Sequence, residues 1–267
     1  MSIWGHLEEL RIRLFHSVLA IIIMTIISFS LGPSEGMILG HQIPIVVPTT
    51  SNSFAAEMFI RMKKDLLPPD TMLVTQSPID AMLTLFQISI LLGIILTMPI
   101  HFYEFVKFVS PGLFPEEKKV IMLLVPSATL LFIAGTLFSY FLIAPFTFSY
   151  LYDYAGYIDA TPMITVQEFL NFSLMLVLMV GVLFDLPVFM ATFTAMGIVP
   201  SIFWKRRWRE AVMVILIIAA VITPDGTGVT QIIITLPMLL LYWSGYLASM
   251  MVERKKHALI TVTQEKH

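Results

Sequence analysis

Long stretches without charged residues alternate with short polar segments along the whole chain. A helix that crosses a bilayer needs about 20 consecutive, mostly apolar residues, and six runs reach or approach that length. The runs are residues 14–31, 81–103, 120–152, 169–196 (interrupted only by Asp185), 211–223 and 226–252. This pattern predicts an all-α polytopic membrane protein, a single transmembrane domain over residues 1–267 with six transmembrane helices.

The composition agrees with a membrane protein. Hydrophobic residues make up 57% of the 267 residues and charged residues only 13%, with a mean hydropathy of +0.86. The net charge of −2 and the lack of a basic, aromatic-rich patch argue against a nucleic-acid partner. The chain has no cysteine, which excludes disulfides and thiolate metal sites.

The polar segments predict several local features. The fifth run holds thirteen residues, or about 20 Å of helix against roughly 30 Å of hydrocarbon, so helices five and six should be short and thin the bilayer. Alternatively, helix five extends over residues 204–210. Residues 54–67 could form an amphipathic helix outside the membrane, Thr165 to Glu168 form a capping-box pattern, and the first run is expected to be a retained helix.

The distribution of Lys and Arg predicts the orientation. With the N-terminus inside, thirteen of the sixteen fall on the cytoplasmic side and three, Arg61, Lys63 and Lys64, lie outside. Both termini are then cytoplasmic. The cytoplasmic segments would be residues 1–13, 104–119, 197–210 and 253–267, and residues 32–77 would form an external loop.

Polar residues in four places are candidates for function. Pro111, Gly112 and Pro115 form a rigid turn that holds Glu116 and Glu117 at a helix start, although a plain solvated loop would look the same. Glu9 is either a binding carboxylate or the partner of Arg13 in an exposed intrahelical ion pair.

Asp185 is the ionisable residue deep in a span, where a charge costs about 2.5–3.5 kcal/mol, so it is a candidate site unless it only shapes the kink at Pro187. Thr223, Gln231 and Thr235 form a sparse polar patch that could be a docking site or ordinary interhelical hydrogen bonding.

The chain carries no HExxH, GxSxG or P-loop sequence, and its six histidines lack metal-ligand spacing, so we expect no catalytic site, metal or cofactor. Two non-enzymatic functions are compatible with these residues. One is a proton- or cation-coupled secondary transporter using Asp185, which should show inverted repeats. The other is a scaffolding protein, which would tolerate neutralisation of Glu9, Glu117 and Asp185.

Four segments together resemble a known family. They are HLEELRIRL at residues 6–14, FVSPGLFPEEKK at 108–119, FDLPV at 184–188, and TPDG at 223–226 followed by Gln231. In this order they are similar to the TatC subunits of the twin-arginine protein translocase, over nearly the whole chain. The external loop matches that family only in position and length.

The resemblance implies a receptor in the bacterial-type plasma membrane that binds twin-arginine signal peptides of folded cargo on the cytoplasmic face. Export would be driven by the proton motive force, in a receptor complex containing further copies of the chain. The implied signal-peptide residues are Glu9, Arg11, Phe108, Leu113 and Glu117.

The resemblance also implies that Thr223 and Gln231 dock the single-span TatA and TatB subunits. It places the family's intramembrane acid on Asp185, where the family usually has Glu. Asp225 is offset from the family's usual TPPD pattern, and Trp243 stands where that family commonly has an acid, so neither receives a role.

Overall fold

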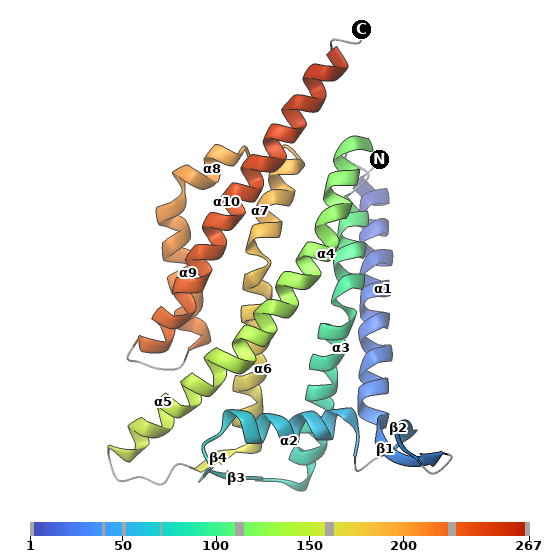
Figure 1. The fold of residues 1–267 in the computed structure, drawn as a ribbon, viewed down its shortest axis with the longest axis vertical. Coiled ribbons are helices and arrows are strands. Elements are labelled where there is room, and N and C mark those ends of the chain that lie inside the picture. The colour runs from blue at the N-terminus through green and yellow to red at the C-terminus, as the bar shows by residue number, and fades with distance from the viewer. Residues whose placement is uncertain are drawn as a thin grey trace. The chain divides into compact units, whose positions relative to one another are not determined.

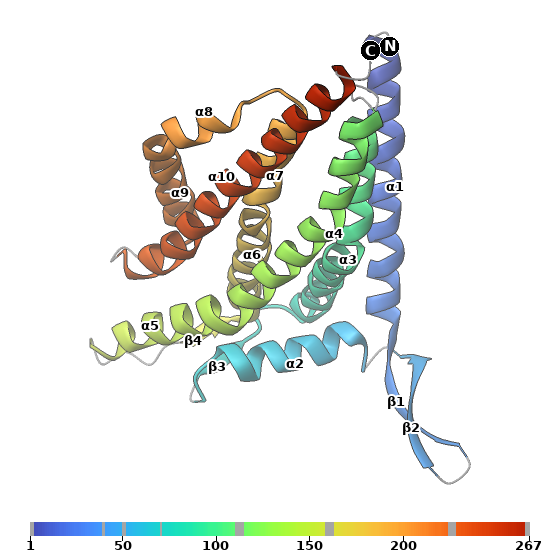
Figure 2. The same ribbon diagram turned by 45° about the horizontal axis from the view of Figure 1, so that its top comes forward.

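The computed structural model of the chain describes residues 3–38, 41–49, 52–69, 71–109, 115–157, 163–223 and 228–264. The chain packs as two compact units, traced by element in Figures 1 and 2. The first unit contains Met1–Ile100 and Tyr140–Leu178, and the second contains His101–Ser139 and Met179–His267. Helices α3 (Pro78–Val109) and α6 (Val166–Phe184) each contribute residues to both units.

The first unit begins with the long helix α1 (Ile3–Ser30), which runs directly into a β-hairpin. Strands β1 (Leu31–Ile38) and β2 (His41–Pro48) pair antiparallel, with Leu31 opposite Pro48 and Ile38 opposite His41. Figure 2 shows the hairpin continuing from the end of α1. Residues 31–38 and 41–48 therefore form strands that the hydrophobic pattern did not predict.

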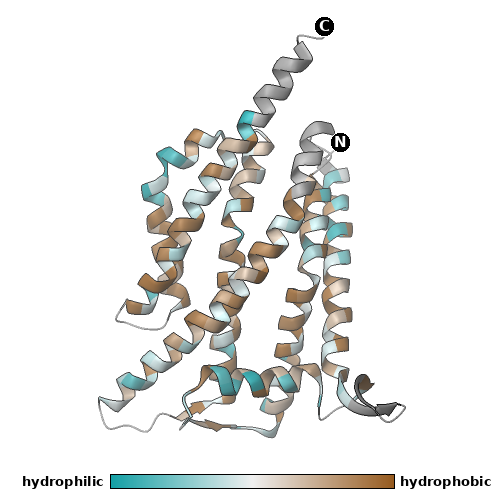
Figure 3. Ribbon diagram, viewed as in Figure 1, coloured by the Kyte–Doolittle hydropathy of each residue, from teal (hydrophilic) through white to brown (hydrophobic). Residues whose placement is uncertain are grey.

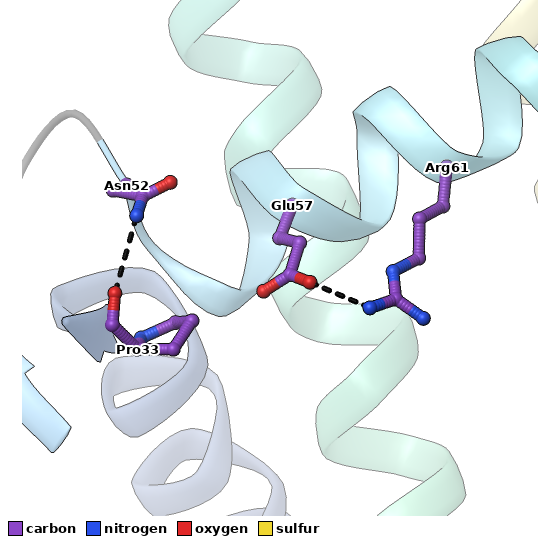
Figure 4. A network of polar contacts seen from close by, with 4 residues as sticks. All are labelled: Pro33, Asn52, Glu57 and Arg61. Atoms are coloured by element: carbon purple, nitrogen blue, oxygen red, sulfur yellow. Dashed lines mark hydrogen bonds and ion pairs between the residues drawn. The ribbon is translucent and has the colours of Figure 1, made fainter. Parts of the chain in front are cut away.

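The amphipathic helix predicted at residues 54–67 is confirmed as α2 (Phe54–Leu66). Its N-terminus is capped by the Ser53 hydroxyl, which accepts a hydrogen bond from the Ala56 N–H at 3.3 Å, and such a cap contributes about 1 kcal/mol. Ala55, Met62 and Leu66 form its buried face. On the polar face Arg61 donates to Glu57 at 2.7 Å (Figure 4).

The segment before α2 is tied back to the hairpin. The Asn52 side-chain amide donates to the Pro33 carbonyl at 3.1 Å, as Figure 4 shows. Beside it, a Cβ placed on Gly32 would lie only 1.7 Å from the Asn52 carbonyl oxygen. Only glycine permits this close approach of two backbone segments.

The first unit also contains a small parallel sheet. Strand β3 (Met72–Val74) pairs with β4 (Met163–Thr165), which leads directly into α6. The predicted capping box is confirmed, since the Glu168 N–H donates to the Thr165 hydroxyl and the Thr165 N–H donates to the Glu168 carboxylate, both at 3.1 Å.

Helices α1 and α3 lie backbone to backbone in the first unit. A Cβ on Gly93 would lie 2.8 Å from the Thr25 hydroxyl and 3.1 Å from the Ile21 carbonyl oxygen. Small residues at such crossings let membrane helices approach closely. The rings of Phe29 and Phe86 meet edge to face on the same pair of helices.

The long third run is not one uniform helix. Helix α4 (Pro115–Phe138) passes into a π-helical turn, η2 (Ser139–Ile143), and continues as α5 (Ala144–Gly156). Pro145 lies in the first turn of α5, where the missing N–H is tolerated. A π-helical turn is an uncommon local irregularity that is frequently found at functional sites.

In the second unit, α6 ends at Phe184 and α7 (Leu186–Ala195) begins two residues later, so the predicted break at Pro187 is confirmed. Helix α7 ends in a Schellman motif around Gly197, whose φ is +73°. There the Gly197 N–H donates to the Thr194 carbonyl and the Ile198 N–H to the Phe193 carbonyl.

Three further helices complete the second unit: α8 (Ser201–Arg206), α9 (Trp208–Ile222) and α10 (Val229–Gln264). Helix α10 packs against α7, α9 and α8. It approaches α7 closely at Gly245, where a Cβ would lie 2.6 Å from the Met190 sulfur and 2.9 Å from the Pro187 Cα.

Within the described residues, five helical segments are long and apolar enough to cross a membrane. They are Trp4–Ser30, Pro78–Val109, Leu124–Gly156, Val166–Ala195 and Val229–Arg254. Brown, apolar positions dominate these helices in Figure 3. The chain is therefore a helical, multi-pass membrane protein, and the sixth span, expected at residues 211–223, falls on the 15-residue helix α9 and stays a prediction.

Two expectations about the last helices need correction. Helix five neither begins at Ala211 nor runs through residues 204–210, because the chain bends at Arg207, whose backbone (φ −99°, ψ 19°) is not helical. Helix six is not short, since α10 has 36 residues and continues through the charged tail. That tail contains good helix formers and no Gly or Pro to end the helix.

Candidate functional site

Glu9 lies on α1, and its two carboxylate oxygens lie in different environments. Glu9 Oε1 accepts a hydrogen bond from Arg13 Nη2 at 3.2 Å, which confirms the predicted ion pair between residues four apart. The two side chains are only 17% and 23% exposed, so the pair is more enclosed than a typical surface pair. Glu9 Oε2 is buried and has no hydrogen-bond partner among the described residues, which leaves one acceptor for a cationic ligand.

The other predicted signal-peptide residues are distributed over both units. Arg11 is exposed on α1 in the first unit, and Phe108 is half-buried near the end of α3 in the second. Glu117 lies in the first turn of α4, and its side chain is outside the described residues. Leu113 also lies outside them. Helix α4 begins at Pro115, in agreement with the predicted helix start before Glu116 and Glu117, whereas α3 continues six residues past the predicted end of its run, to Val109.

A small apolar pocket lies in the second unit between the end of α3, α4 and α7. Its walls are almost entirely apolar, and Phe105 and Phe189 meet there edge to face. The lining residues are Phe102, Phe105, Val106, Leu124, Val125, Ala128, Val188, Phe189 and Thr192. The sequence did not reveal this pocket, because its residues come from three separate apolar runs and from the segment 104–119 between two of them.

Asp185 occupies the break between α6 and α7. Its backbone carbonyl accepts the N–H groups of Val188 and Phe189, which starts α7, but its side chain forms no capping bond. The residue is 1% exposed, and Oδ1 has no hydrogen-bond partner among the described residues. A buried carboxylate oxygen without a partner is costly, which is typical of a residue kept for function.

Thr223 and Gln231 stand at opposite sides of the α9–α10 connection, whose residues 224–227, including Asp225, lie outside the described residues. The Thr223 hydroxyl donates to the Ala219 carbonyl of its own helix at 2.8 Å. The Gln231 amide reaches across to the Leu216 carbonyl of α9 at 2.9 Å. Gln231 therefore forms an interhelical hydrogen bond. This is the alternative to a docking role that the sequence left open for this polar patch.

Residues that the sequence did not single out fix the segment around α8. The Trp204 indole N–H donates to the Thr194 hydroxyl at 3.1 Å, and the Trp204 carbonyl accepts the Tyr242 hydroxyl at 2.5 Å. The Glu253 carboxylate accepts the Ser201 N–H at 3.1 Å. In the sequence, Glu253 was marked only as an acid directly before the basic residues Arg254, Lys255 and Lys256.

Comparison with known proteins gives one consistent family. The family profile described as "Sec-independent protein translocase protein (TatC)" matches residues 5–237. The TatC protein of Cenarchaeum symbiosum is 32% identical over 96% of this chain and 97% of its own length. The TatCy protein of Bacillus subtilis is 30% identical over 96% of this chain and 91% of its own.

Solved structures agree with the sequence comparison. A crystal structure of a twin-arginine translocase receptor, TatC, superimposes with a TM-score of 0.72 at 27% identity, over 92% of this chain and 99% of that one. A second crystal structure of that receptor gives 0.74 at 28% identity, over 91% and 99%. The chain therefore belongs to the TatC family of Sec-independent protein translocase subunits, which are transport proteins and not enzymes.

Proposed function

We propose that this chain is the signal-peptide receptor of its translocase and binds the paired arginines of twin-arginine signal peptides. The observation that carries the proposal is the Glu9 carboxylate, which has one oxygen on Arg13 and one buried oxygen without a partner in the described part of the chain. Arg11, Phe108, Leu113 and Glu117 complete the proposed binding region.

The chemistry of the two carboxylates accounts for selection of arginine. A guanidinium is a planar fork of donors that a carboxylate accepts in a defined geometry, whereas an ammonium is a point charge. Each charged hydrogen bond contributes about 1.5–3 kcal/mol, so two acids supply enough to sort signals while binding stays reversible. The apolar pocket between the end of α3, α4 and α7 offers a surface for the apolar part of a signal.

The test is binding of a twin-arginine signal peptide and of its Lys-Lys counterpart to the protein in nanodiscs, at one fixed salt concentration. We expect selective binding of the arginine peptide and a loss of about tenfold or more for Glu9→Gln and for Glu117→Gln. Glu8→Gln, at the exposed neighbouring position, is the matched control and should bind normally.

A second control separates binding from helix stability. Arg13→Gln breaks the ion pair but keeps the Glu9 carboxylate, so it should bind the peptide at least as well as the unchanged protein. Equal binding of both peptides, or unchanged binding in the Glu9→Gln, Glu117→Gln double variant, would contradict the receptor proposal.

The remaining parts of the proposal concern the assembly. Thr223 and Gln231 would recruit TatA- and TatB-type subunits, further copies of the chain would join the receptor complex, and the proton motive force would drive export. Six spans with both termini in the cytoplasm would place Glu9 and Glu117 on one side of the plasma membrane. This orientation is supported by the excess of Lys and Arg in the predicted cytoplasmic segments.

A second candidate, coupled transport of a proton or cation through Asp185, is favoured by the unpartnered Oδ1 of that buried acid. Ion flux into proteoliposomes without any cargo would support it. The absence of flux, together with selective peptide binding, would leave Asp185 a role within protein translocation.

A further inference from the structure

The corner between α8 and α9 concentrates positive charge on an exposed surface. Four exposed cations, Lys205, Arg206, Arg207 and Arg209, lie within five residues, with Glu210 as the adjacent acid. Arg207 and Glu210 form an ion pair at 3.2 Å in which both side chains are more than half exposed, so it neutralises the corner only weakly. Teal marks this corner in Figure 3.

Large apolar side chains are exposed on the same stretch. Ile202 is 46% exposed, Phe203 41% and Trp208 42%. The guanidinium of Arg207 lies 5.8 Å from the Phe203 ring centre, and that of Arg209 lies 5.6 Å from the Trp208 ring centre. Exposed aromatic rings beside arginines are typical of the boundary between lipid tails and headgroups.

The local fold holds this surface in place. Trp204, at the centre of α8, is fixed through its indole N–H and its carbonyl, and the Ser201 N–H is fixed by Glu253. Ser201 is buried and Trp204 half-buried, while Ile202, Phe203, Lys205 and Arg206 are exposed. A ligand that meets this corner therefore finds cations whose backbone is already ordered.

The corner also marks a change of environment along the chain. Helix α9 begins at Trp208 and carries no charged residue between Ala211 and Ile222. The cations thus stand at the polar end of an apolar helix, and in a helix that enters the bilayer this end lies among the phospholipid headgroups. Glu210 and Glu253 are the acids near this corner, and Glu253 is already engaged by the Ser201 N–H.

We propose that the α8–α9 corner is a binding site for an anionic phospholipid headgroup. Lys205, Arg206 and Arg209 contact the phosphate and the headgroup charge, while Phe203 and Trp208 lie at the acyl boundary. Charge complementarity selects an anionic over a zwitterionic lipid, and the apolar side chains select a lipid over a free anion. This site is separate from the carboxylates proposed for signal binding.

The test is native mass spectrometry of the purified full-length protein in detergent, titrated with phosphatidylglycerol or with phosphatidylcholine of the same acyl chains. The test variant combines Lys205→Gln, Arg206→Gln and Arg209→Gln. The matched control combines Arg61→Gln, Lys63→Gln and Lys64→Gln, which removes the same charge from α2. Each cation near an anionic membrane surface contributes about 1 kcal/mol, or about fivefold in affinity.

We expect tight phosphatidylglycerol binding to fall at least tenfold in the test variant and to stay unchanged in the control. Millimolar inorganic phosphate should not displace the lipid. The proposal is overturned by equal loss in both variants, by equal binding of the two lipids, or by displacement with phosphate, which would indicate a simple anion site. It is also overturned if the test variant keeps its affinity for phosphatidylglycerol and loses only the ability to capture an acidic protein. Signal-peptide binding, measured in parallel, should be unaffected because Glu9 and Glu117 are unchanged.

Discussion

The hydroxyl of Tyr140 donates a hydrogen bond to Oδ2 of Asp65 at 2.8 Å, joining residues 75 positions apart in sequence. Tyr140 lies in the π-helical turn η2, and Asp65 lies in the last turn of α2. The contact joins the amphipathic helix α2 to the irregular turn within the third long helical segment. Helix α2 is therefore a structural part of the first unit and not a loose insertion.

Removing this hydroxyl should loosen α2. We expect Tyr140→Phe to lower the free energy of unfolding by about 1 kcal/mol, because one hydrogen bond is lost while the ring stays in place. Thermal unfolding in detergent and protease cleavage between α2 and β3 would measure the effect. Tyr154→Phe, at a half-exposed tyrosine on α5, is the control and should leave both unchanged. Identical melting of the two variants would contradict the prediction.

Gly32→Ala should disrupt the packing of the β-hairpin against the segment before α2, because the new Cβ would lie only 1.7 Å from the Asn52 carbonyl oxygen. The backbone has to move, so we expect a loss of about 2 kcal/mol or more and faster proteolysis around β1 and β2. Gly156→Ala is a matched control, since a Cβ there meets no atom within 4 Å. If both glycine variants are equally stable, the close approach is not required.

The combination Thr223→Val with Gln231→Leu should reduce co-purification of TatA- and TatB-type subunits. The interhelical bond from Gln231 to Leu216 is lost as well, at a cost of about 0.6 kcal/mol, so the protein should remain folded. Thr129→Val on α4 is the control, because this threonine lies outside the polar patch and its hydroxyl bonds only to the Val125 carbonyl of its own helix among the contacts described. Normal recovery of both partners would show that these two residues serve helix packing alone.

Asp185→Asn should stabilise the fold while lowering export. The substitution keeps the size of the side chain and removes a buried ionisable group with an unpartnered oxygen, which we expect to raise the free energy of unfolding by about 1–3 kcal/mol. Chemical denaturation and an export assay in vesicles would be compared. A variant that is destabilised but exports normally would show that Asp185 only shapes the helix break.

The parts of the fold that depend on local sequence could be predicted. The pairing of Glu9 with Arg13, the capping box at Thr165 and the amphipathic helix α2 all follow from residues three or four apart. The break at Asp185 follows from Pro187. In each case the determining interaction lies within one or two helical turns.

The parts that depend on distant residues could not be predicted. The η2 turn, the bond from Gln231 to Leu216 and the fixing of Trp204 by Tyr242 each require knowledge of which helices meet. The β-hairpin was missed because residues 31–48 lack regular alternation and contain Pro33, Pro44 and Pro48, which are poor strand residues. The length of α10 was missed because a change from apolar to charged residues ends a span but not a helix.

The carboxylate of Glu253 joins α10 to the first residue of α8 by a single hydrogen bond, and α10 extends beyond Glu253 to Gln264. A stiff helix acts as a lever, so force applied to this tail is transmitted to α8 before any unfolding occurs. A molecule that pulls on the last turns of α10 would thereby strain the positively charged corner. The Tyr242 hydroxyl, which donates to the Trp204 carbonyl, is a second hydrogen bond from α10 to α8, so traction on the C-terminal helix would reach the corner through both contacts.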